Sequence, residues 1–293
     1  LNAEKTLRKL EPELVLITAE TEDYFLVTQA ANKLNIKTAL LPHGIDVWGF
    51  KEIKCGRFQT VDYCFAHGNE DITYFENQGV SAKAIRKTSH PWYEKLLPVR
   101  PIHEKKYNQA LVLAYEMYSN SAYEKISVFN KYIVGVVETL LELGIVVKYF
   151  KIRGEYVLKS HGEASDDNIK VGEHSIEIVQ GYGNLEEYLG QVDLVVGPIS
   201  TALIETNLCG KDYYAYQNYR HLELVDGGQP SIYKYVNVAF DMKQLRENIE
   251  KKHTFKSNCS VKDLVDLDGI KTKKGLFHKF ESEIQAVLSD NVN

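Results

Sequence analysis

Apolar residues recur along the chain with two periods, one typical of buried strands and the other typical of amphipathic helices. In the N-terminal third, strands are predicted at residues 14–17, 37–41, 61–66 and 84–88, and helices at about residues 2–10, 24–34 and 69–77. Asn35 and Gly79 follow two of these helices and can end them in the left-handed conformation. Strands and helices that alternate in this way predict parallel βαβ units.

A second series of the same kind begins after Pro98, Pro101 and the charged residues 103–106, which predict an interdomain linker. Its strands are predicted at residues 109–114, 145–150, 192–196 and 212–216, with shorter ones at 169–171, 176–179 and 235–240, and its helices at about residues 122–143, 185–189, 200–208, 242–252 and 276–288. A length of 293 residues is enough for two domains that each bury a core. The sequence therefore predicts an α/β protein with domains at residues 1–98 and 99–293.

Residues 192–211 combine a buried strand, a tight turn and a helix. The apolar run ends at Gly197-Pro198, and Ser200 and Thr201 stand where the next helix begins. Hydroxyls and free backbone N–H groups at a helix N-terminus bind anions, and open α/β sheets bind ligands at the carboxyl ends of their strands. The stretch thus predicts a phosphate site, and the alternative is that the two hydroxyls only cap the helix.

Three histidines follow predicted strands of the N-terminal series, namely His43, His67 and His90. Because the carboxyl ends of parallel strands meet at one edge of a sheet, we expect the three side chains to face one cleft. A neutral histidine near pH 7 can accept a proton from a hydroxyl group, and His43, which Gly44 follows, is the candidate for that base. The alternative for each histidine is a structural hydrogen bond to a loop carbonyl.

Charge and composition argue against several classes of function. The net charge of −5 and the pI near 6.0 argue against a protein that binds nucleic acid by neutralising phosphates. No apolar run reaches the ~18–20 residues that span a bilayer. The four cysteines lie far apart without a CxxC pair, which is typical of free thiols in a cytoplasmic protein, and no essential metal is expected. The chain begins at Leu1 rather than Met, so a shortened N-terminal domain is a further expectation.

Four stretches together resemble the GT-B glycosyltransferases, which have two facing Rossmann-like domains with parallel sheets and a cleft between them. They are Leu40-Leu-Pro-His-Gly44, Val61-Asp-Tyr-Cys-Phe-Ala-His-Gly68 with the following helix, Arg86-Lys-Thr-Ser-His-Pro91, and residues 193–211 with their Ser-Thr pair, Glu205 and Gly-Lys end. The likeness is strongest to bacterial surface-polysaccharide transferases, namely CDP-glycerol glycerophosphotransferases and capsule, lipopolysaccharide and Kdo- or sialic-acid-type transferases. Such enzymes often carry Lys-x-His-Pro after the second strand of the C-terminal domain, whereas here Tyr149 and Phe150 follow Lys148.

The resemblance implies an enzyme that moves a sugar or polyol phosphate from a CMP-, CDP- or UDP-linked donor to a cell-envelope polysaccharide or glycolipid, without a further cofactor. It implies a cytoplasmic enzyme, with peripheral contact to the inner membrane, and it leaves the oligomeric state open. His43 would be catalytic. The residues implied in donor or phosphate binding are Ser200, Thr201, Glu205, Lys151 and Arg153, and further candidates for the cleft are His67, His90, Gly44 and Gly197.

Two other functions remain open at the level of sequence. One is a nucleotide-sugar 2-epimerase of the same fold, although the acidic residues and the second-domain histidine of those enzymes are not found here in recognisable spacing. The other is a non-catalytic nucleotide-binding module, which a short N-terminal domain would favour.

Overall fold

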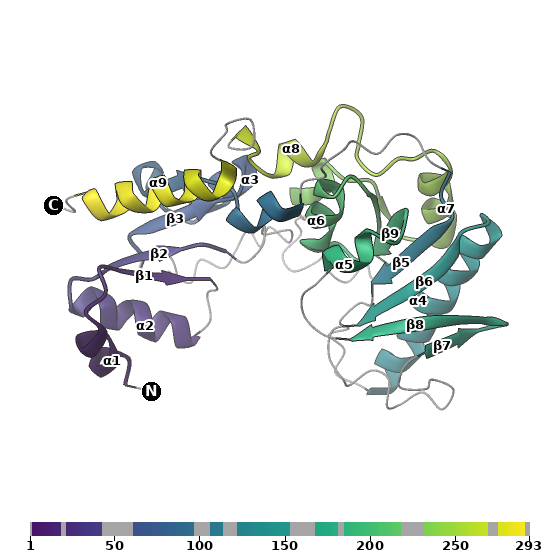
Figure 1. Ribbon diagram of the computed structural model, residues 1–293, viewed down its shortest axis with the longest axis horizontal. Helices are drawn as coiled ribbons and strands as arrows, with labels where there is room; N and C mark the ends of the chain where they lie inside the picture. Colours follow the sequence, from purple (N-terminus) through teal and green to yellow (C-terminus); the bar gives the residue numbers. More distant parts are fainter. Residues whose placement is uncertain are drawn as a thin grey trace. The chain divides into compact units, whose positions relative to one another are not determined.

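The structure, a computed structural model, describes residues 2–18, 22–42, 61–96, 106–113, 122–152, 168–180, 185–217, 231–268 and 275–290. These residues form two compact units, each built around its own sheet (Figure 1). The first unit contains the described residues up to Lys95 and those from Ser260 onward, and the second contains most of those in between. The predicted α/β class is confirmed.

Within the described residues, the sheet of the first unit has four parallel strands in the order β1-β2-β3-β4. The strands are β1 (Leu14–Ile17), β2 (Lys37–Leu40), β3 (Tyr63–Ala66) and β4 (Ile85–Lys87); the helices of this unit are α1 (Ala3–Leu10), α2 (Glu22–Lys33), α3 (Asn69–Asn77), α8 (Val261–Leu264) and α9 (Gly275–Ser289), with short 3-10 helices at Ala82–Ala84 and Pro91–Leu96. Asn35 and Gly79 have positive φ angles, as predicted for residues that end helices. Parallel pairing brings the carboxyl ends of all four strands to one edge of the sheet.

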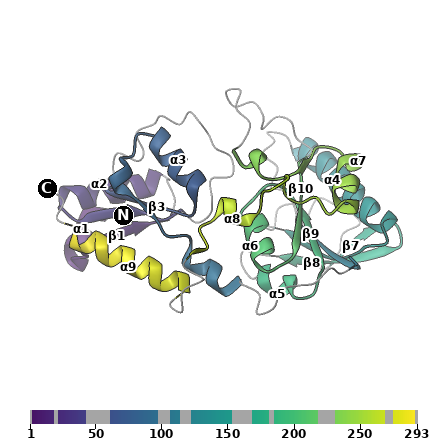
Figure 2. The ribbon, with the colours of Figure 1, turned by 90° about the horizontal axis from the view of Figure 1, so that it is seen from above.

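The two faces of this sheet are covered by different parts of the chain, because successive side chains of a strand point to opposite faces. On one face, Leu40 and Cys64 pack with Phe75 of α3. On the other face, Phe65 packs edge-on against Phe280 of α9, with 5.2 Å between the ring centroids. Figure 2 shows α9 and α3 on opposite sides of β3. The core of the first unit is therefore completed by the C-terminal helix.

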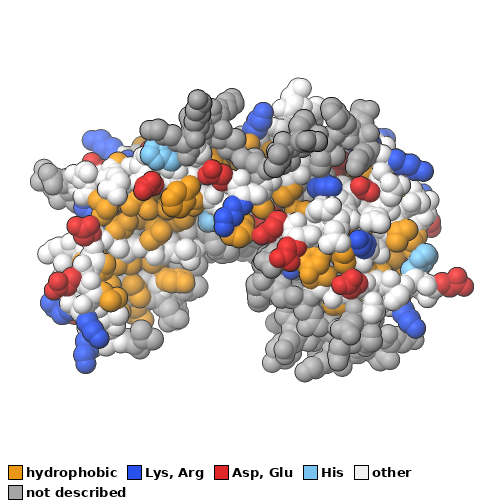
Figure 3. Space-filling model, in the orientation of Figure 1, with side chains coloured by type: hydrophobic (Ala, Val, Ile, Leu, Met, Phe, Trp, Pro, Cys, Tyr) orange, Lys and Arg blue, Asp and Glu red, His pale blue; other side chains and the backbone are white. Residues whose placement is uncertain are grey.

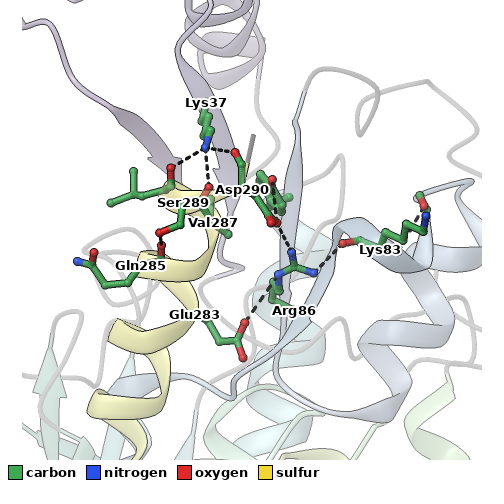
Figure 4. A network of polar contacts seen from close by, with 11 residues as sticks. Lys37, Lys83, Arg86, Glu283, Gln285, Val287, Ser289 and Asp290 are labelled. Carbon is green, nitrogen blue, oxygen red and sulfur yellow. Dashed lines mark hydrogen bonds and ion pairs between the residues drawn. The ribbon is translucent and has the colours of Figure 1, made fainter. Parts of the chain in front are cut away.

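The placement of α9 corrects the predicted domain boundary, which assigned all of residues 99–293 to the second domain. The Lys37 ammonium at the start of β2 donates hydrogen bonds to the carbonyls of Val287 and Leu288, both at 2.8 Å. Arg86 of β4 pairs with Asp290 at 2.7 Å (Figure 4). Cations at a helix C-terminus satisfy its last carbonyls and interact favourably with its dipole. Residues 275–290 thus belong to the first unit, a placement that sequence order alone does not indicate.

Hydrophobic side chains also gather on the surface of the first unit over β1 and α2 (Figure 3). Leu16 of β1 is 38% exposed, and Phe25 and Leu26 of α2 are 38% and 59% exposed. Leu16 lies on an edge strand of the described sheet.

In the part of the chain that the structure describes, the sheet of the second unit has seven strands in the order β11-β10-β9-β5-β6-β8-β7. The strands are β5 (Gln109–Leu113), β6 (Val146–Ile152), β7 (Asn168–Val171), β8 (His174–Gln180), β9 (Leu194–Gly197), β10 (Asp212–Tyr216) and β11 (Val238–Ala239); the helices are α4 (Ala122–Glu142), α5 (Leu185–Leu189), α6 (Ala202–Leu208) and α7 (Met242–Glu250). All pairs are parallel except β7 with β8. Apart from the antiparallel edge strand β7, this is the strand order of a Rossmann fold, which reverses between β5 and β9.

Helices cover both faces of the second sheet. Side chains of α4 and α7 form the main core with one face, as Val137 and Leu245 do with Val112 and Val196. Helices α5 and α6 pack together, and α6 also contacts β10 (Figures 1 and 2). The central strands β5 and β9 are near-continuous apolar runs because both of their faces are buried.

We predict that Lys37→Met lowers the free energy of unfolding by about 1–2 kcal/mol, because it leaves carbonyls at the end of α9 without their cationic donor. Urea denaturation followed by circular dichroism would measure this loss. Lys33→Met is the matched control, since Lys33 is exposed at the end of α2 and its replacement should change stability by less than about 0.5 kcal/mol. An equal effect of both substitutions would contradict an anchoring role for Lys37.

Candidate functional site

The turn between β9 and α6 lies at the point where the strand order of the second sheet reverses. After β5 the chain forms β6 and β8 on one side of it, and then returns to form β9 on its other side. Connections that leave neighbouring strands in opposite directions open a crevice at the carboxyl ends of those strands. Gly197 is the last residue of β9, so Ser200 and Thr201 follow directly at this crevice.

The hydroxyl groups of Ser200 and Thr201 do not cap α6. Thr201 is the N-cap residue, but its side chain makes no capping hydrogen bond, and its backbone is already helical, with φ −56° and ψ −26°. In the part of the chain that the structure describes, the carbonyls of the two residues accept hydrogen bonds, Ser200 O from Leu203 and Thr201 O from Ile204 and Glu205. Within the described residues, neither the amides nor the hydroxyls of Ser200 and Thr201 donate a hydrogen bond to protein. Both side chains are partly exposed, so up to four donors remain available at this turn.

Gly197 is required for close packing at the same turn. A Cβ atom there would lie 2.5 Å from the Tyr213 hydroxyl and 2.9 Å from Cβ of Leu113. The Tyr213 hydroxyl donates a hydrogen bond to the Pro198 carbonyl, and this contact fixes the path of the chain into Ser200. Any larger residue at position 197 would therefore displace the turn.

Lys151 lies at the same edge of the sheet, two strands away. It is partly buried near the end of β6 and is in register with Leu113 of β5 and Val179 of β8. Its ammonium lies 5.6 Å from the centroid of the Tyr188 ring, which α5 provides. The structure thus brings Lys151 and the Ser200 turn to one edge of one sheet, as predicted.

Glu205 lies in α6, one turn after Thr201, and its side chain is partly buried. Burial, followed by the negative charges of Glu186 and Glu205, raises the pKa of the Cys209 thiol to about 11. Cys209 is therefore a neutral thiol near pH 7 and a poor nucleophile. Hydrogen bonding of Glu205 to a ribose stays a prediction.

In the first unit, His67 is completely buried just after β3. Its Nε2 lies 2.9 Å from the carbonyl oxygen of Pro42, and because a carbonyl only accepts hydrogen bonds, Nε2 carries the proton. The backbone of His67 is held as well, since its N–H donates to the Asp71 carboxylate at 2.8 Å and its carbonyl accepts from Asp266 N. This histidine is therefore fixed in one orientation and holds the carbonyl of the residue that precedes His43.

The glycine after His67 allows a close approach by the returning C-terminal segment. A Cβ atom on Gly68 would lie 2.2 Å from the carbonyl oxygen of Leu264. Asp266 of this segment accepts a hydrogen bond from the Lys279 ammonium at 2.6 Å. Burial alone would raise the pKa of the Asp266 carboxyl, but hydrogen bonds from Lys279 and from the Asp268 N–H outweigh it and hold the pKa below its usual value. The Asp266 carboxylate is therefore ionised at neutral pH and pairs with Lys279, while the backbone N–H of the same residue holds the His67 carbonyl.

His90 follows β4 and stacks on His67, with ring centroids 5.5 Å apart and ring planes inclined by 25°. Tyr93 packs against both imidazoles. The Trp92 N–H donates to Nδ1 of His90 at 3.2 Å, so neutral His90 carries its proton on Nε2. His90 thus presents a hydrogen-bond donor rather than a base. The structure thus places His67 and His90 side by side after β3 and β4, and the prediction that the three histidines face one cleft stays a prediction.

Three predicted site residues, His43, Gly44 and Arg153, lie outside the described residues. Among the described residues, no three His, Cys, Asp or Glu side chains gather into a group that could hold a metal ion. In the same residues, no helix has both the length and the apolar character needed to cross a bilayer.

Sequence analysis did not identify three residues that contact the predicted site residues, namely Tyr188, Asp71 and Asp266. Asp71 could have been found from its place in the first turn of α3, four residues after His67, where a carboxylate binds free amides. Tyr188 and Asp266 are in contact with residues distant in the sequence, so no local pattern marks them.

Comparison with known proteins gives structural neighbours only. No family model matches the chain, and no curated protein matches it. Among solved structures, UDP-GlcNAc 2-epimerase from Methanocaldococcus jannaschii is similar over 97% of this chain and 80% of that chain, with a TM-score of 0.56 and 12% identity. The UDP-GlcNAc 2-epimerase from Neisseria meningitidis bound to UDP-GlcNAc covers 98% and 79%, with a TM-score of 0.54 and 11% identity. The lipopolysaccharide outer core galactosyltransferase WaaB covers 98% and 78%, with a TM-score of 0.50 and 13% identity.

At sequence identities this low, the structural similarity supports a statement about the fold alone. The chain has the GT-B-like α/β fold, in which each unit is Rossmann-like and its sheet is parallel apart from the edge strand β7. The predicted fold class is confirmed at this level.

We predict that replacing both Ser200 and Thr201 by Ala changes the free energy of unfolding by less than about 0.5 kcal/mol, because neither hydroxyl caps α6. Asp241→Ala is the positive control. Asp241 caps α7 by accepting a hydrogen bond from Gln244 N at 2.8 Å, and its loss should cost about 1 kcal/mol. If the double variant were destabilised as much as Asp241→Ala in thermal or urea unfolding, the capping interpretation would be restored.

Proposed function

We propose that this protein is an enzyme that acts on a nucleotide-activated sugar and binds the phosphates of that substrate at the turn between β9 and α6. The observation that carries the proposal is the set of donors on Ser200 and Thr201, which the described residues leave unused at the switch point of a Rossmann-like sheet. Amides and hydroxyls that converge on one turn are suited to phosphate oxygens. The similarity in fold to enzymes of nucleotide sugars supports the same assignment.

The charge at this edge also favours an anion. Lys151 lies in the cross-sheet row that includes Leu113, and its ammonium can neutralise a phosphate as a point charge. Helix α6 has only seven residues, so its dipole is a smaller contribution than the hydroxyls and the lysine. The proposed phosphate binding therefore depends mainly on the hydroxyls after β9 and on Lys151 near the end of β6.

A uridine nucleotide is the first candidate, because the structural neighbours include an epimerase bound to UDP-GlcNAc. The sequence resemblance to CDP-glycerol and Kdo- or sialic-acid-type transferases keeps CDP and CMP as candidates. A thermal-shift panel of UDP, CDP, CMP and GDP would identify the nucleotide. Stabilisation by none of them would favour a different function for the fold.

We predict that the Ser200→Ala/Thr201→Ala variant loses ten-fold or more in affinity for the bound nucleotide, because hydrogen bonds to charged groups contribute about 1.5–3 kcal/mol each. Its affinity for the bare nucleoside, which has no phosphate, should change little. Isothermal titration calorimetry with UDP and uridine would measure both. Equal weakening for nucleoside and nucleotide would mean that the pair acts through the fold.

Two reactions fit a nucleotide sugar at this site. The neighbours named as UDP-GlcNAc 2-epimerases support epimerisation at C2, and this reading is at least as well supported as the transfer that the sequence motifs first implied. The galactosyltransferase WaaB supports glycosyl transfer, for which the acceptor would be a cell-envelope glycan or glycolipid. We place epimerisation first and transfer second.

Incubation with UDP-GlcNAc separates the two reactions. An epimerase converts the substrate to its C2 epimer with the nucleotide still attached, which proton NMR of the anomeric and C2 protons would detect. A transferase instead releases UDP, and only when an acceptor is present. Nucleotide binding with neither product would support a non-catalytic module.

His43 is proposed as the residue that handles a proton in either reaction, because it follows β2 in the sequence and the carbonyl before it is held by His67. We predict that His43→Ala lowers turnover by roughly 10²–10⁴-fold while nucleotide affinity stays within a few-fold. The product assay and a calorimetric titration would test both parts. Near-normal turnover of the variant would remove His43 from the mechanism. That one substrate contacts the strand ends of both units stays a prediction.

A further inference from the structure

The side chain of Lys151 reaches the α5 side of the second sheet because β6 contains a β-bulge. The register between β5 and β6 shifts after Ala110, which pairs with Val147, while the next residue Leu111 pairs with Tyr149. Lys148 is therefore the extra residue of the bulge. Val147 packs in the core with α4 and α7, whereas Tyr149 and Lys151 contact α5 on the other face. Without the bulge, regular alternation would direct Lys151 into the α4 core.

On the α5 side, an aromatic pair receives the lysine. The ring of Tyr188 lies edge-on to Tyr149, with 5.1 Å between centroids, and the Lys151 ammonium lies 5.6 Å from the centroid of the Tyr188 ring. The Tyr149 hydroxyl in turn donates to Oε1 of Gln191 at 2.7 Å. Tyr188 is thus oriented from one side by Tyr149 and offers its ring to a cation, a contact that is favourable at this distance.

The second lysine of β6 is directed elsewhere. The Lys148 ammonium donates to Oε1 of Gln191 at 3.1 Å and lies 5.1 Å from the centroid of the Tyr149 ring. It is thus bound on the Gln191 side, whereas Lys151 is three residues nearer to the carboxyl edge. Because of the bulge, Lys148 has a structural contact with Gln191, whereas Lys151 lies at the candidate site.

Lys151 and the phosphate-binding turn are at a distance that one ligand can bridge. Lys151 pairs with Leu113, Leu113 lies against Gly197, and Gly197 precedes the Ser200 turn. Two strand spacings separate β6 from β9, which is about 10 Å. A lysine has a flexible four-carbon stem, so its charge can approach a phosphate that the turn holds.

We propose that Tyr188 is a positioning residue, which holds the Lys151 ammonium over its ring and directs it to the phosphates of the nucleotide. This inference rests on the proposed function and adds to it a second phosphate contact with its own aromatic support. A flexible lysine loses rotamer freedom when it binds an anion, and a ring that restricts it beforehand reduces that loss.

The test is calorimetric titration of UDP and uridine into wild type and five variants: Tyr188→Leu, Tyr188→Phe, Lys151→Met, Lys148→Met and the double variant Tyr188→Leu/Lys151→Met. We expect Tyr188→Leu to weaken UDP binding about three-fold, which is the scale of a cation–π contact at a partly exposed site. Lys151→Met should weaken it ten-fold or more. Tyr188→Phe, which keeps the ring, and Lys148→Met, which removes the structural lysine, should bind UDP as wild type does, and all variants should bind uridine equally.

The double variant shows whether the ring acts through the lysine. If it does, Tyr188→Leu causes no additional loss of UDP affinity once Lys151 is replaced by Met. The same three-fold loss in both backgrounds, or a loss for Tyr188→Phe equal to that for Tyr188→Leu, would overturn the positioning role. Wild type that binds none of UDP, CDP, CMP and GDP would overturn the proposed function itself. If it binds another of these nucleotides but not UDP, that nucleotide and its nucleoside replace UDP and uridine.

Discussion

The second sheet reverses its strand order between β5 and β9, and this reversal determines the position of the hydrogen-bond donors on Ser200 and Thr201. Connections to β6 and to β9 leave β5 on opposite sides, so the carboxyl ends of β5 and β9 border a crevice. Position 197 at this crevice requires glycine, because the Tyr213 hydroxyl leaves no room for a side chain there. Among the described residues, the first turn of α6 is closed by backbone hydrogen bonds, and the amides and hydroxyls of Ser200 and Thr201 donate to no protein group.

The first unit depends on a different constraint, the return of the C-terminal chain. Its sheet presents Ala39 and Phe65 on a face that the N-terminal helices do not cover, and α9 supplies the missing layer. Burial of this apolar face is the main gain, and the cations Lys37 and Arg86 then fix the end of the helix. The same return brings Asp266 to the backbone of His67. Packing of the core and shaping of the histidine edge are therefore linked.

The hydrogen bonds of the histidines divide their chemical roles. His67 and His90 both carry a proton on Nε2 when neutral, because Nε2 of His67 faces a carbonyl and Nδ1 of His90 accepts an N–H. His67 already donates this proton to the Pro42 carbonyl, so its role is structural, whereas the ring N–H of His90 is a hydrogen-bond donor. His43, which the strand-end pattern predicts as a base, stays a proposal. The proposed phosphate site on a GT-B-like fold would suit either epimerisation or transfer, because both reactions would begin with the same bound nucleotide.

The sequence by itself determined the local elements and the strand-turn-helix of residues 192–211. Apolar periodicity, with Asn35, Gly79 and Gly144 at positive φ, is enough for this because the interactions are local. Tertiary structure alone decided that α9 joins the first unit, that Lys148 forms a bulge, that Tyr188 meets Lys151, and that the Ser200 and Thr201 hydroxyls are not caps. Each of these depends on contacts between residues far apart in the chain, or on a register shift of one residue. Propensity and periodicity do not encode such contacts, because the free energy that selects them arises only when the layers pack.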